Sequence, residues 1–381
     1  MKYNSFQDDR LSALGFGLMR LPMKDGAIDA RQTAEMIDLA IRSGVNYFDN
    51  AWPYHDGLSE TVCGEILSHY PRSSYRLADK FPGHQHLDNF TPAPIFEKQL
   101  EKCRVEYFDY YLLHNVCENS QDTYLNDQWG LLDYFLEQKR LGRIRHLGFS
   151  AHGEPECLRR FLDSQWGEHM EFCQIQLNYI DWTLQKADEK VALLNERHIP
   201  IWVMEGLRGG MLAEKGVEKA FRWIQQVPGV VVTLSGMSNL DQMKENIDIF
   251  SRLAPLDDDE QKELCSYTES LGNFIPCTSC RYCQSECPQG LSIPSLLSVL
   301  NDIRVGGASL TPMMFIEALP AHQQPSACLS CGNCSYICPQ HIDIPAAMAE
   351  LAGEYEKGTK WSEICRKRNE IARQLSKQNN Q

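Results

Sequence analysis

The sequence lacks the features that mark membrane, secreted and nucleic-acid-binding proteins. No apolar run in its 381 residues approaches the roughly 18 residues of a membrane span, and the N-terminal stretch MKYNSFQDDRLSALGFG has no apolar signal core. Basic residues are also few, because 37 Lys and Arg stand against 51 Asp and Glu and leave a net charge of −14. Such a charge argues against non-specific binding to nucleic acid or anionic membrane. We therefore expect a cytoplasmic protein with no nucleic-acid partner and no membrane partner.

A second absence concerns the fold. The glycine pattern G-x-G-x-x-G, which marks the first turn of a Rossmann domain, does not occur in the chain. The hydrophobic fraction of 43% and the charged fraction of 23% are those of an ordinary globular protein. A chain of this length can hold a barrel of roughly 250 residues and a smaller module.

Short apolar runs rich in β-forming residues alternate with amphipathic stretches from about residue 13 to residue 253. The eight runs are LGFGLMR, VNYFDNA, YRLADKF, FDYYLLH, IRHLGFS, FCQIQLN, IPIWVME and GVVVTLSG. Helical patterns lie between them, with Asp127, Thr183 and Asn239 at positions that suit an N-cap. Strands that alternate with helices form parallel βαβ units, and eight such units predict an α/β fold of the closed (β/α)₈ TIM-barrel type.

The pattern changes after residue 254. We predict a barrel domain over residues 1–255, an acidic connector over 256–271 and a small, mainly α-helical iron–sulfur domain over 272–381. In this last part a cysteine-rich run, a helical stretch and a second cysteine-rich run follow one another, and a basic amphipathic helix is expected from residue 360 onward.

The chain has fifteen cysteines, and in a cytoplasmic protein these should be thiols or metal ligands and not disulfides. Eight of them form two runs with the spacing C-x₂-C-x₂-C-x₃-C-P, which is the spacing of bacterial two-cluster ferredoxins. The two runs are Cys277, Cys280, Cys283 and Cys287, closed by Pro288, and Cys328, Cys331, Cys334 and Cys338, closed by Pro339.

The spacing also predicts how these cysteines pair. The first three of each run are close enough to bind three corners of one [4Fe–4S] cluster, while the fourth is directed to the other cluster. We therefore predict two clusters, one held by Cys277, Cys280, Cys283 and Cys338, the other by Cys328, Cys331, Cys334 and Cys287. A pair of tetrahedral zinc sites is the alternative, but the third closely spaced cysteine and the Cys-Pro ending favour iron–sulfur clusters. The 40 residues between Cys287 and Cys328 read as helical, so this part resembles the α-helical ferredoxin modules attached to redox enzymes.

Polar residues close three consecutive predicted strands of the barrel. Asp49 ends the second strand and Tyr54 follows it, while Lys80 ends the third strand and His114 the fourth. Active sites of such barrels lie at the carboxyl ends of the strands, so these four side chains should meet there. A tyrosine donates its proton to a carbonyl only if a cation lowers its pKa. Lys80, held by Asp49, would supply that cation, and His114 would orient the carbonyl oxygen.

The segments YFDNAWPYH, LADKF and YLLHN resemble the Asp-Tyr-Lys-His tetrad of the aldo-keto reductase family. LGFGLMRLP resembles the first strand and turn of that family, and the resemblance covers residues 13 to about 253. The whole chain resembles bacterial aldo-keto reductase-like proteins with a C-terminal 4Fe–4S ferredoxin domain. The resemblance implies an oxidoreductase that transfers hydride between NAD(P)H and a carbonyl compound, with Tyr54 as general acid, Lys80 tuning its pKa, Asp49 as partner of Lys80 and His114 orienting the substrate.

The same resemblance implies a set of contacts to the dinucleotide. Ser150 and Gln174 match the ligands of the nicotinamide carboxamide, and Glu245 and Asn246 match residues near the adenine. Leu207, Arg208 and Gly210 lie where the pyrophosphate would pass. Gly236 and Gln242 stand where many NADP-preferring members carry basic residues, so the cofactor is expected to be NADP(H) or NAD(H), with the choice open.

The expected partners are a small carbonyl substrate and a redox protein. Met19, Trp52, His55 and the loop over residues 115–129 are expected to line an apolar and aromatic substrate pocket. Nicotinamide transfers two electrons as hydride whereas a [4Fe–4S] cluster carries one, and the sequence has no separate flavin signature. Two alternatives therefore stay open: an iron–sulfur electron carrier or docking protein with a non-catalytic barrel, and an enzyme whose clusters are structural.

Overall fold

The structure of the full chain is a computed structural model. It describes all residues except 56, 84–88, 118–119, 271–273, 276, 278–281, 307–309, 337, 339–341, 361, 364–365 and 368–381. The chain divides into two compact units, Met1–Leu264 and Cys265–Gln381. Among the described residues, no helix is long and apolar enough to cross a membrane.

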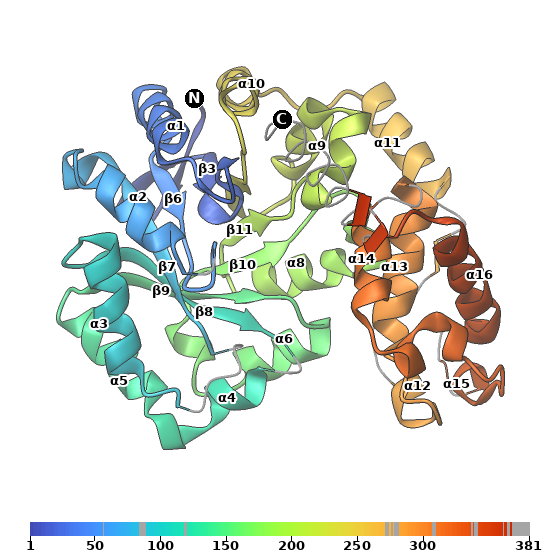
Figure 1. The fold of residues 1–381 in the computed structure, drawn as a ribbon. Helices are drawn as coiled ribbons and strands as arrows, with labels where there is room; N and C mark the ends of the chain where they lie inside the picture. Colours follow the sequence, from blue (N-terminus) through green and yellow to red (C-terminus); the bar gives the residue numbers. More distant parts are fainter. Residues whose placement is uncertain are drawn as a thin grey trace, which may run out of the picture. The chain divides into compact units, whose positions relative to one another are not determined.

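Eight parallel strands close into a barrel in the first unit, as the alternating pattern predicts (Figure 1). Each strand pairs with its neighbours in chain order, and the last pairs with the first. The strands are β3 (Leu14–Gly17), β6 (Tyr47–Asp49), β7 (Arg76–Phe81), β8 (Phe108–Val116), β9 (Ile144–Ala151), β10 (Cys173–Gln176), β11 (Ile201–Met204) and β12 (Val230–Ser235). All carboxyl ends therefore lie at one rim, which is where the predicted tetrad belongs.

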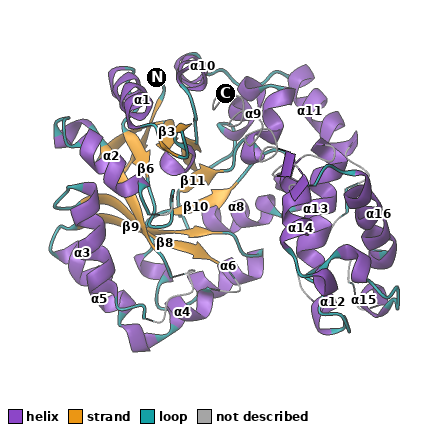
Figure 2. Cartoon of the chain, in the orientation of Figure 1, coloured by secondary structure: helices purple, strands orange, loops and turns teal. Residues whose placement is uncertain are grey.

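Helices surround the barrel on the outside (Figure 2). They are α1 (Ala30–Arg42), α2 (Ser59–Leu67), α3 (Pro92–Cys103), α4 (Gln121–Leu125), α5 (Leu131–Arg140), α6 (Pro155–Leu162), α7 (Asp181–Leu184), α8 (Ala187–Glu196), α9 (Val217–Ile224) and α10 (Leu240–Ser251). Their amphipathic pattern buries one side: in α1 the buried residues are Thr33, Met36, Ile37 and Ala40, a spacing that forms one helical face. Short 3₁₀ helices of this unit are η1 (Leu18–Arg20), η2 (Arg72–Ser74), η3 (Asp127–Trp129), η4 (Gly167–His169) and η5 (Arg208–Lys215), whereas η6 (Ala321–Gln323) and η7 (Pro325–Ala327) belong to the second unit.

An N-terminal hairpin that the sequence patterns did not predict packs against the amino ends of the barrel strands. It consists of β1 (Tyr3–Phe6) and β2 (Asp9–Ser12). Phe6 packs edge-on against Trp202, with ring centroids 5.0 Å apart, and also contacts Phe172. The hairpin thus covers the aromatic interior of the barrel. A second small hairpin, β4 (Met23–Lys24) with β5 (Ala27–Ile28), follows the first barrel strand.

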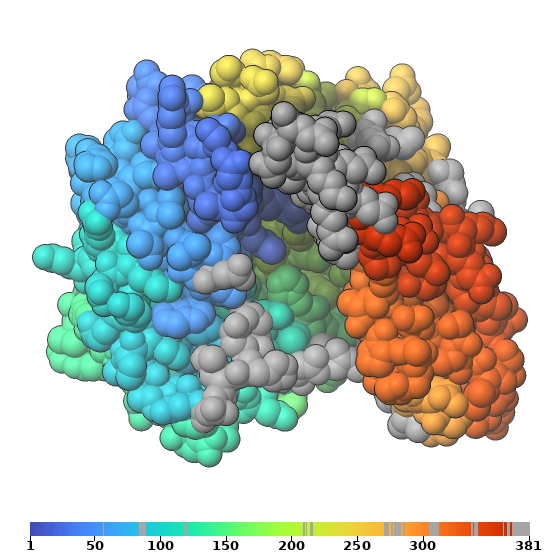
Figure 3. Space-filling model, viewed as in Figure 1, coloured from blue at the N-terminus to red at the C-terminus, as the bar shows by residue number. Residues whose placement is uncertain are grey.

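The regular elements described in the second unit are all helices, as predicted. Its helices are α12 (Tyr282–Ser285), α13 (Ile293–Gly306), α14 (Leu310–Ala318), α15 (Asn333–Tyr336) and α16 (Ile344–Lys357), preceded by α11 (Asp258–Ser270). A core that includes Leu296, Leu300, Met348 and Leu351 joins them, and they form one continuous body (Figure 3). Helix α11 occupies the predicted connector. The helix predicted from residue 360 lies almost entirely outside the described residues.

Candidate active site

The structure brings Asp49, Lys80 and Tyr54 together at the carboxyl rim of the barrel. Asp49 is the last residue of β6, and Lys80 lies near the end of the neighbouring β7. The Lys80 ammonium donates to Asp49 Oδ1 at 2.5 Å, to the Asn50 carbonyl at 2.7 Å and to the Tyr54 hydroxyl at 3.3 Å. Lys80 and Asp49 are buried, so the pair is shielded from water and interacts strongly.

This burial affects the protonation of Lys80 and Tyr54. Burial, the largest single effect, would lower the pKa of Lys80, but the charges and hydrogen bonds of Asp49 and Tyr54 together outweigh it and raise the pKa above its usual value. Lys80 is therefore a cation at neutral pH. Burial raises the pKa of Tyr54 above its usual value, while the charge of Lys80 acts in the opposite direction. The sequence predicts that Lys80 lowers the pKa of Tyr54. The charge of Lys80 does act in that direction, but burial has the larger effect, so the net pKa shift is upward. Tyr54 is accordingly protonated at neutral pH.

His114 completes the group on β8. It is buried, and its ring stands edge-on to the Tyr54 ring with centroids 6.1 Å apart. The Tyr124 hydroxyl donates to the His114 carbonyl at 2.5 Å and to the Phe81 carbonyl at 3.2 Å. The backbone at the ends of β7 and β8 is thus held by one buried side chain, and this fixes His114 beside Tyr54.

The residues expected to line a substrate pocket lie around this rim. Met19 is exposed, whereas Trp52 and His55 are half-buried. The His55 ring accepts a hydrogen bond from the Leu21 backbone at 3.1 Å, which ties the loop that carries Tyr54 to the turn after β3. The 115–129 loop is described except at residues 118 and 119.

Ser150 and Gln174 lie opposite each other on neighbouring strands, β9 and β10. The Ser150 hydroxyl accepts from the Asn115 backbone at 2.7 Å. Gln174 Oε1 and Asn115 Oδ1 are buried and have no hydrogen-bond partner among the described residues. Two buried acceptors without donors suit the NH₂ group of a carboxamide, since buried polar atoms normally have partners. The residues present therefore fit a nicotinamide ring beside the tetrad.

A cavity at the same rim contains most of the other predicted cofactor residues. Leu207, Gly210, Glu245 and Asn246 line it. The remaining lining residues come from the turn after β3, from the segment that follows β11, from η5 and α9, from the end of β12 and the turn after it, and from α10: Arg20, Glu205, Gly206, Ala213, Val217, Phe221, Leu234, Ser235, Gly236, Met237, Ser238 and Gln242. Asn246 donates to the Ser235 hydroxyl at 2.8 Å, and this bond fixes α10 at the cavity wall.

Arg208 is held differently from the other predicted cofactor residues. Its guanidinium pairs with Asp181 at 3.3 Å. Asp181 is fully buried and also accepts from the side chains of Gln176 and Asn178, both at 2.7 Å. The side chain of Arg208 thus pairs with a buried carboxylate beside the cavity. In addition to this structural contact, Arg208 is adjacent to the path predicted for the pyrophosphate.

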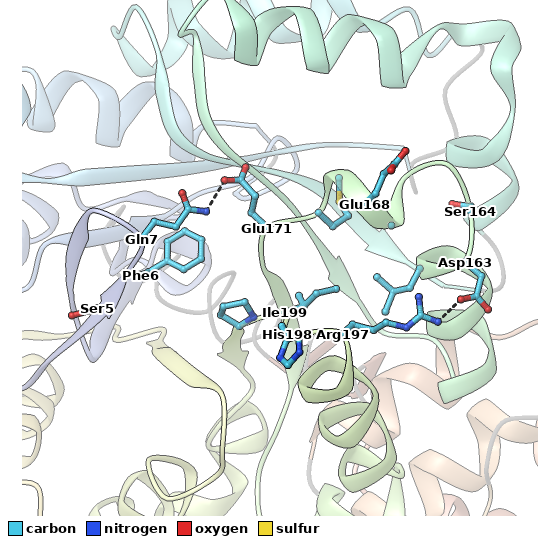
Figure 4. A pocket seen from close by; sticks show the side chains of 14 residues that line it. Ser5, Phe6, Gln7, Asp163, Ser164, Glu168, Glu171, Arg197, His198 and Ile199 are labelled. Atoms are coloured by element: carbon cyan, nitrogen blue, oxygen red, sulfur yellow. Dashed lines mark hydrogen bonds and ion pairs between the residues drawn. The ribbon is translucent and has the colours of Figure 1, made fainter.

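Another cavity of the first unit lies at the opposite end of the barrel (Figure 4). Residues of the N-terminal hairpin and residues that precede β10 and β11 line it, among them Gln7, Asp163, Glu171 and Arg197. These side chains are engaged with one another, since Gln7 donates to Glu171 at 2.9 Å and Arg197 pairs with Asp163. Barrel enzymes carry their chemistry at the carboxyl rim, so this cavity is not assigned to the reaction.

Four cysteines of the second unit line one small cavity: Cys287, Cys328, Cys331 and Cys334. They are the set that the spacing assigns to one cluster, with Cys287 contributed by the first motif. The Leu291 backbone donates to Cys287 Sγ at 3.4 Å, and the Ser330 backbone donates to Cys328 Sγ at 3.5 Å. Backbone donors to sulfur suit thiolates that ligate a cluster, so the residues present fit such a group.

The cysteines assigned to the other cluster are seen only in part. Cys277, Cys283 and Cys338 belong to the apolar core of the unit, and Cys280 lies outside the described residues. Helix α12, which carries Cys283, packs against α15, which carries Cys334. Within the described residues, no group of three or more His, Cys, Asp or Glu side chains is arranged to hold a single metal ion.

Comparisons with known proteins agree with this geometry. The profile of the Aldo/keto reductase family matches residues 13–220, which is more than half of the chain. The chain belongs to the aldo/keto reductase family. In addition, the profile of the 4Fe-4S dicluster domain matches residues 276–342, so this aldo/keto reductase carries an iron–sulfur domain at its C-terminal side.

Individual relatives are distant. An uncharacterized oxidoreductase, YqkF, of Bacillus subtilis is 22% identical over 308 residues, which span 68% of this chain and 93% of that protein. The NADH-specific methylglyoxal reductase of Escherichia coli is 26% identical over 225 residues, spanning 54% of this chain and 66% of that protein. Among solved structures, the holo form of an aldo-keto reductase from Bacillus halodurans superposes with a TM-score of 0.56 at 22% identity, covering 70% of this chain and 96% of that chain. At this identity the structural likeness supports the shared fold.

Several contacts that shape the site of this aldo/keto reductase were not predicted. Asn115 has a left-handed backbone, with φ at 57°, and supports Ser150. The carbonyl of Asn50 accepts from Lys80, and Arg20 forms an ion pair with Glu205 at 3.6 Å beside the cavity. Asn50 directly follows Asp49, and Asn115 directly follows His114. Their position next to predicted site residues in the sequence is a signal that could have indicated these contacts. The Arg20–Glu205 pair joins the ends of β3 and β11, and no sequence pattern indicates such a contact.

Proposed function

We propose that this protein transfers hydride between a nicotinamide dinucleotide and a small carbonyl compound or the corresponding alcohol. The observation that carries the proposal is the buried chain from Asp49 to Lys80 to the Tyr54 hydroxyl, placed at the barrel rim where active sites of this fold lie. Ser150 and Gln174 stand on the adjoining strands with an acceptor available for a carboxamide.

In the proposed reaction Tyr54 donates its proton to the carbonyl oxygen. Lys80 stabilises the tyrosinate that this step leaves, because its charge lies 3.3 Å from the hydroxyl oxygen. Asp49 keeps Lys80 charged and fixes its position. His114 orients the carbonyl oxygen toward Tyr54. The dinucleotide, when bound, supplies or accepts the hydride.

We further propose that NADH is preferred to NADPH. Among the described residues that line the cofactor cavity, Arg20 is the one cation, and it is already paired with Glu205. Glu245 adds a negative charge, and Gly236 and Gln242 add none. A 2′-phosphate would enter this acidic environment without a cationic partner. The name of the NADH-specific Escherichia coli relative agrees with this preference, and its substrate suggests a small aldehyde for the present protein.

For the second unit we propose two [4Fe–4S] clusters that exchange single electrons with a redox protein. Cys277, Cys280, Cys283 and Cys338 would hold one cluster, and Cys328, Cys331, Cys334 and Cys287 the other. The support is the shared cavity of the second set and the match to a dicluster domain. Two clusters provide an electron path, which favours transfer over a purely structural function.

The Tyr54→Phe variant tests the proposed reaction. We expect it to lose carbonyl reduction by about 100-fold or more, since positioned acids typically contribute that much, while the affinity for NADH and the cluster absorbance are unchanged. Tyr70→Phe is the matched control, because the Tyr70 hydroxyl bonds Asp38 away from the site. Full activity in Tyr54→Phe would contradict the assignment of the acid. An inactive wild-type protein that binds no dinucleotide would favour a non-catalytic barrel.

A further inference from the structure

Lys102 joins the two sides of the loop that carries Tyr54. This lysine lies on α3, next to its last residue, and its ammonium donates to the Gly57 carbonyl at 3.1 Å. The same ammonium lies 4.3 Å from the centroid of the Trp52 ring, in a cation–π contact. Trp52 precedes Tyr54 by two residues and Gly57 follows it by three, so one cation contacts the chain on both sides of Tyr54.

The backbone couples these contacts to Tyr54 itself. The Gly57 amide donates to the Tyr54 carbonyl at 3.1 Å, and the Ser59 amide donates to the same carbonyl at 3.2 Å. Gly57 has φ at 82°, a left-handed conformation that suits glycine. Any shift of Gly57 would therefore move Tyr54.

Lys102 is anchored by a buried carboxylate. Glu60 on α2 is fully buried and accepts from Lys102 at 2.7 Å. Its other oxygen accepts from Gln99 at 3.1 Å, and Gln99 also donates to the Lys80 carbonyl at 3.0 Å. The Tyr111 hydroxyl holds Gln99 in turn, at 2.6 Å. The network thus links the backbone of Lys80 to the loop of Tyr54.

The close packing of α2 against α3 allows Lys102 to make these contacts. Gly64 on α2 lies so near α3 that a Cβ there would stand 2.4 Å from the Lys102 carbonyl and 2.6 Å from Cys103 Cα. Glycine at this position lets Lys102 reach Glu60 and the loop.

From these contacts we propose that Lys102, tied to Glu60, is a positioning residue that holds the loop of Tyr54, residues 51–55 and 57–58, where Tyr54 reaches Lys80. The catalytic part of this inference rests on the proposed function. In the described contacts Lys102 touches none of the tetrad side chains. It acts through Trp52 and Gly57.

The test compares four variants of the full chain. Lys102→Ala removes the positive charge, and Lys102→Arg keeps a positive charge on a side chain of similar length. Trp52→Leu removes the cation–π contact and leaves the Lys102–Glu60 pair intact, which matters because Lys102→Ala strands a buried carboxylate and risks misfolding. Lys98→Ala is the control, since Lys98 lies one turn earlier on α3 and pairs with exposed Glu101.

Two measurements decide the outcome. Hydrogen exchange of the peptide over residues 50–58, followed by mass spectrometry, reports the loop without any need for activity. We expect faster exchange in Lys102→Ala and Trp52→Leu, and wild-type exchange in Lys98→Ala. In carbonyl reduction we expect kcat to fall by about 10- to 100-fold, since small displacements of reacting groups have effects of that size. The NADH dissociation constant should be unchanged, and Lys102→Arg should recover most of kcat.

Hydrogen exchange at the wild-type rate in both Lys102→Ala and Trp52→Leu would overturn the proposal. Faster exchange with an unchanged kcat would also overturn it, because the loop would then be held without consequence for Tyr54. If the wild-type protein reduces no carbonyl compound, the proposed function fails, and the exchange measurement still decides whether Lys102 holds the loop.

Discussion

At the scale of single residues, the protonation of the site depends on how its buried charged groups are paired. Lys80 stays cationic because Asp49 accompanies it, and Tyr54 stays protonated because burial outweighs the attraction of Lys80. The residue types and their positions at strand ends could be predicted from the sequence. The net direction of the Tyr54 shift could not, because it depends on how much water the fold removes from the hydroxyl.

The choice of dinucleotide is also a matter of single residues. Gln242 lines the cavity and accepts from the Ser238 backbone at 2.8 Å. The Gln242→Arg variant would add a cation there, and we expect its NADPH dissociation constant to fall by about tenfold relative to NADH, as one new charge-assisted bond would give. Binding titration with both dinucleotides measures this.

Gln226→Arg serves as the control for that change, because it adds the same charge on the exposed surface after α9, away from the cavity. Equal effects of the two variants on NADPH binding would mean that total charge and not position matters. Tighter wild-type binding of NADPH than of NADH would contradict the proposed preference.

At the scale of elements, the alternation of apolar runs and amphipathic stretches predicted all eight barrel strands. Helix starts were less well predicted. Asn239 caps α10 as expected, accepting from the Gln242 backbone, but Asp127 falls in a 3₁₀ turn and α5 begins at Leu131, after Gly130 in a left-handed conformation. Similarly, Thr183 lies within the short α7 and α8 begins only at Ala187.

These misses have a common physical cause. A capping side chain is recognised by its type, whereas the actual start depends on which neighbouring residue adopts a left-handed turn. The N-terminal hairpin was missed because its strands are four residues each and are held by aromatic contacts with residues far away in the chain. The Lys102–Glu60 pair was missed for the same reason, since it joins two helices and has no local pattern.

The pairing of the two cysteine motifs is testable at this scale. If Cys287 binds the cluster held mainly by the second motif, Cys287→Ser should alter the same EPR signal that Cys331→Ser alters. Cys283→Ser should alter the other signal. Cys265→Ser is the control, because Cys265 is exposed and lies outside both motifs.

Iron content and EPR spectra of the reduced, anaerobically purified variants would measure this. A Cys287→Ser spectrum that matches Cys283→Ser would show that each motif holds its own cluster and would contradict the crossed pairing. Unchanged iron content in all three motif variants would contradict ligation by these cysteines.

At the scale of the whole molecule, two units of different chemistry share one chain. The barrel is suited to hydride transfer, which moves two electrons at once, and the cysteine-rich unit is suited to single electrons. The two proposed clusters together would accept the two electrons of one hydride, with release of its proton, so the electrons of the dinucleotide would have two destinations in this protein. The geometry of Tyr54, Lys80 and Asp49 favours the carbonyl carbon as the destination.

Tracing deuterium from the C4 position of NADH tests this central claim most directly. The anaerobically purified full chain would be given C4-deuterated NADH and a small aldehyde, with product analysis by mass spectrometry and cluster reduction followed by EPR. We predict deuterium on the former carbonyl carbon, in proportion to the NADH oxidised. Oxidation of NADH with reduced clusters and no deuterium in any alcohol product would contradict the account.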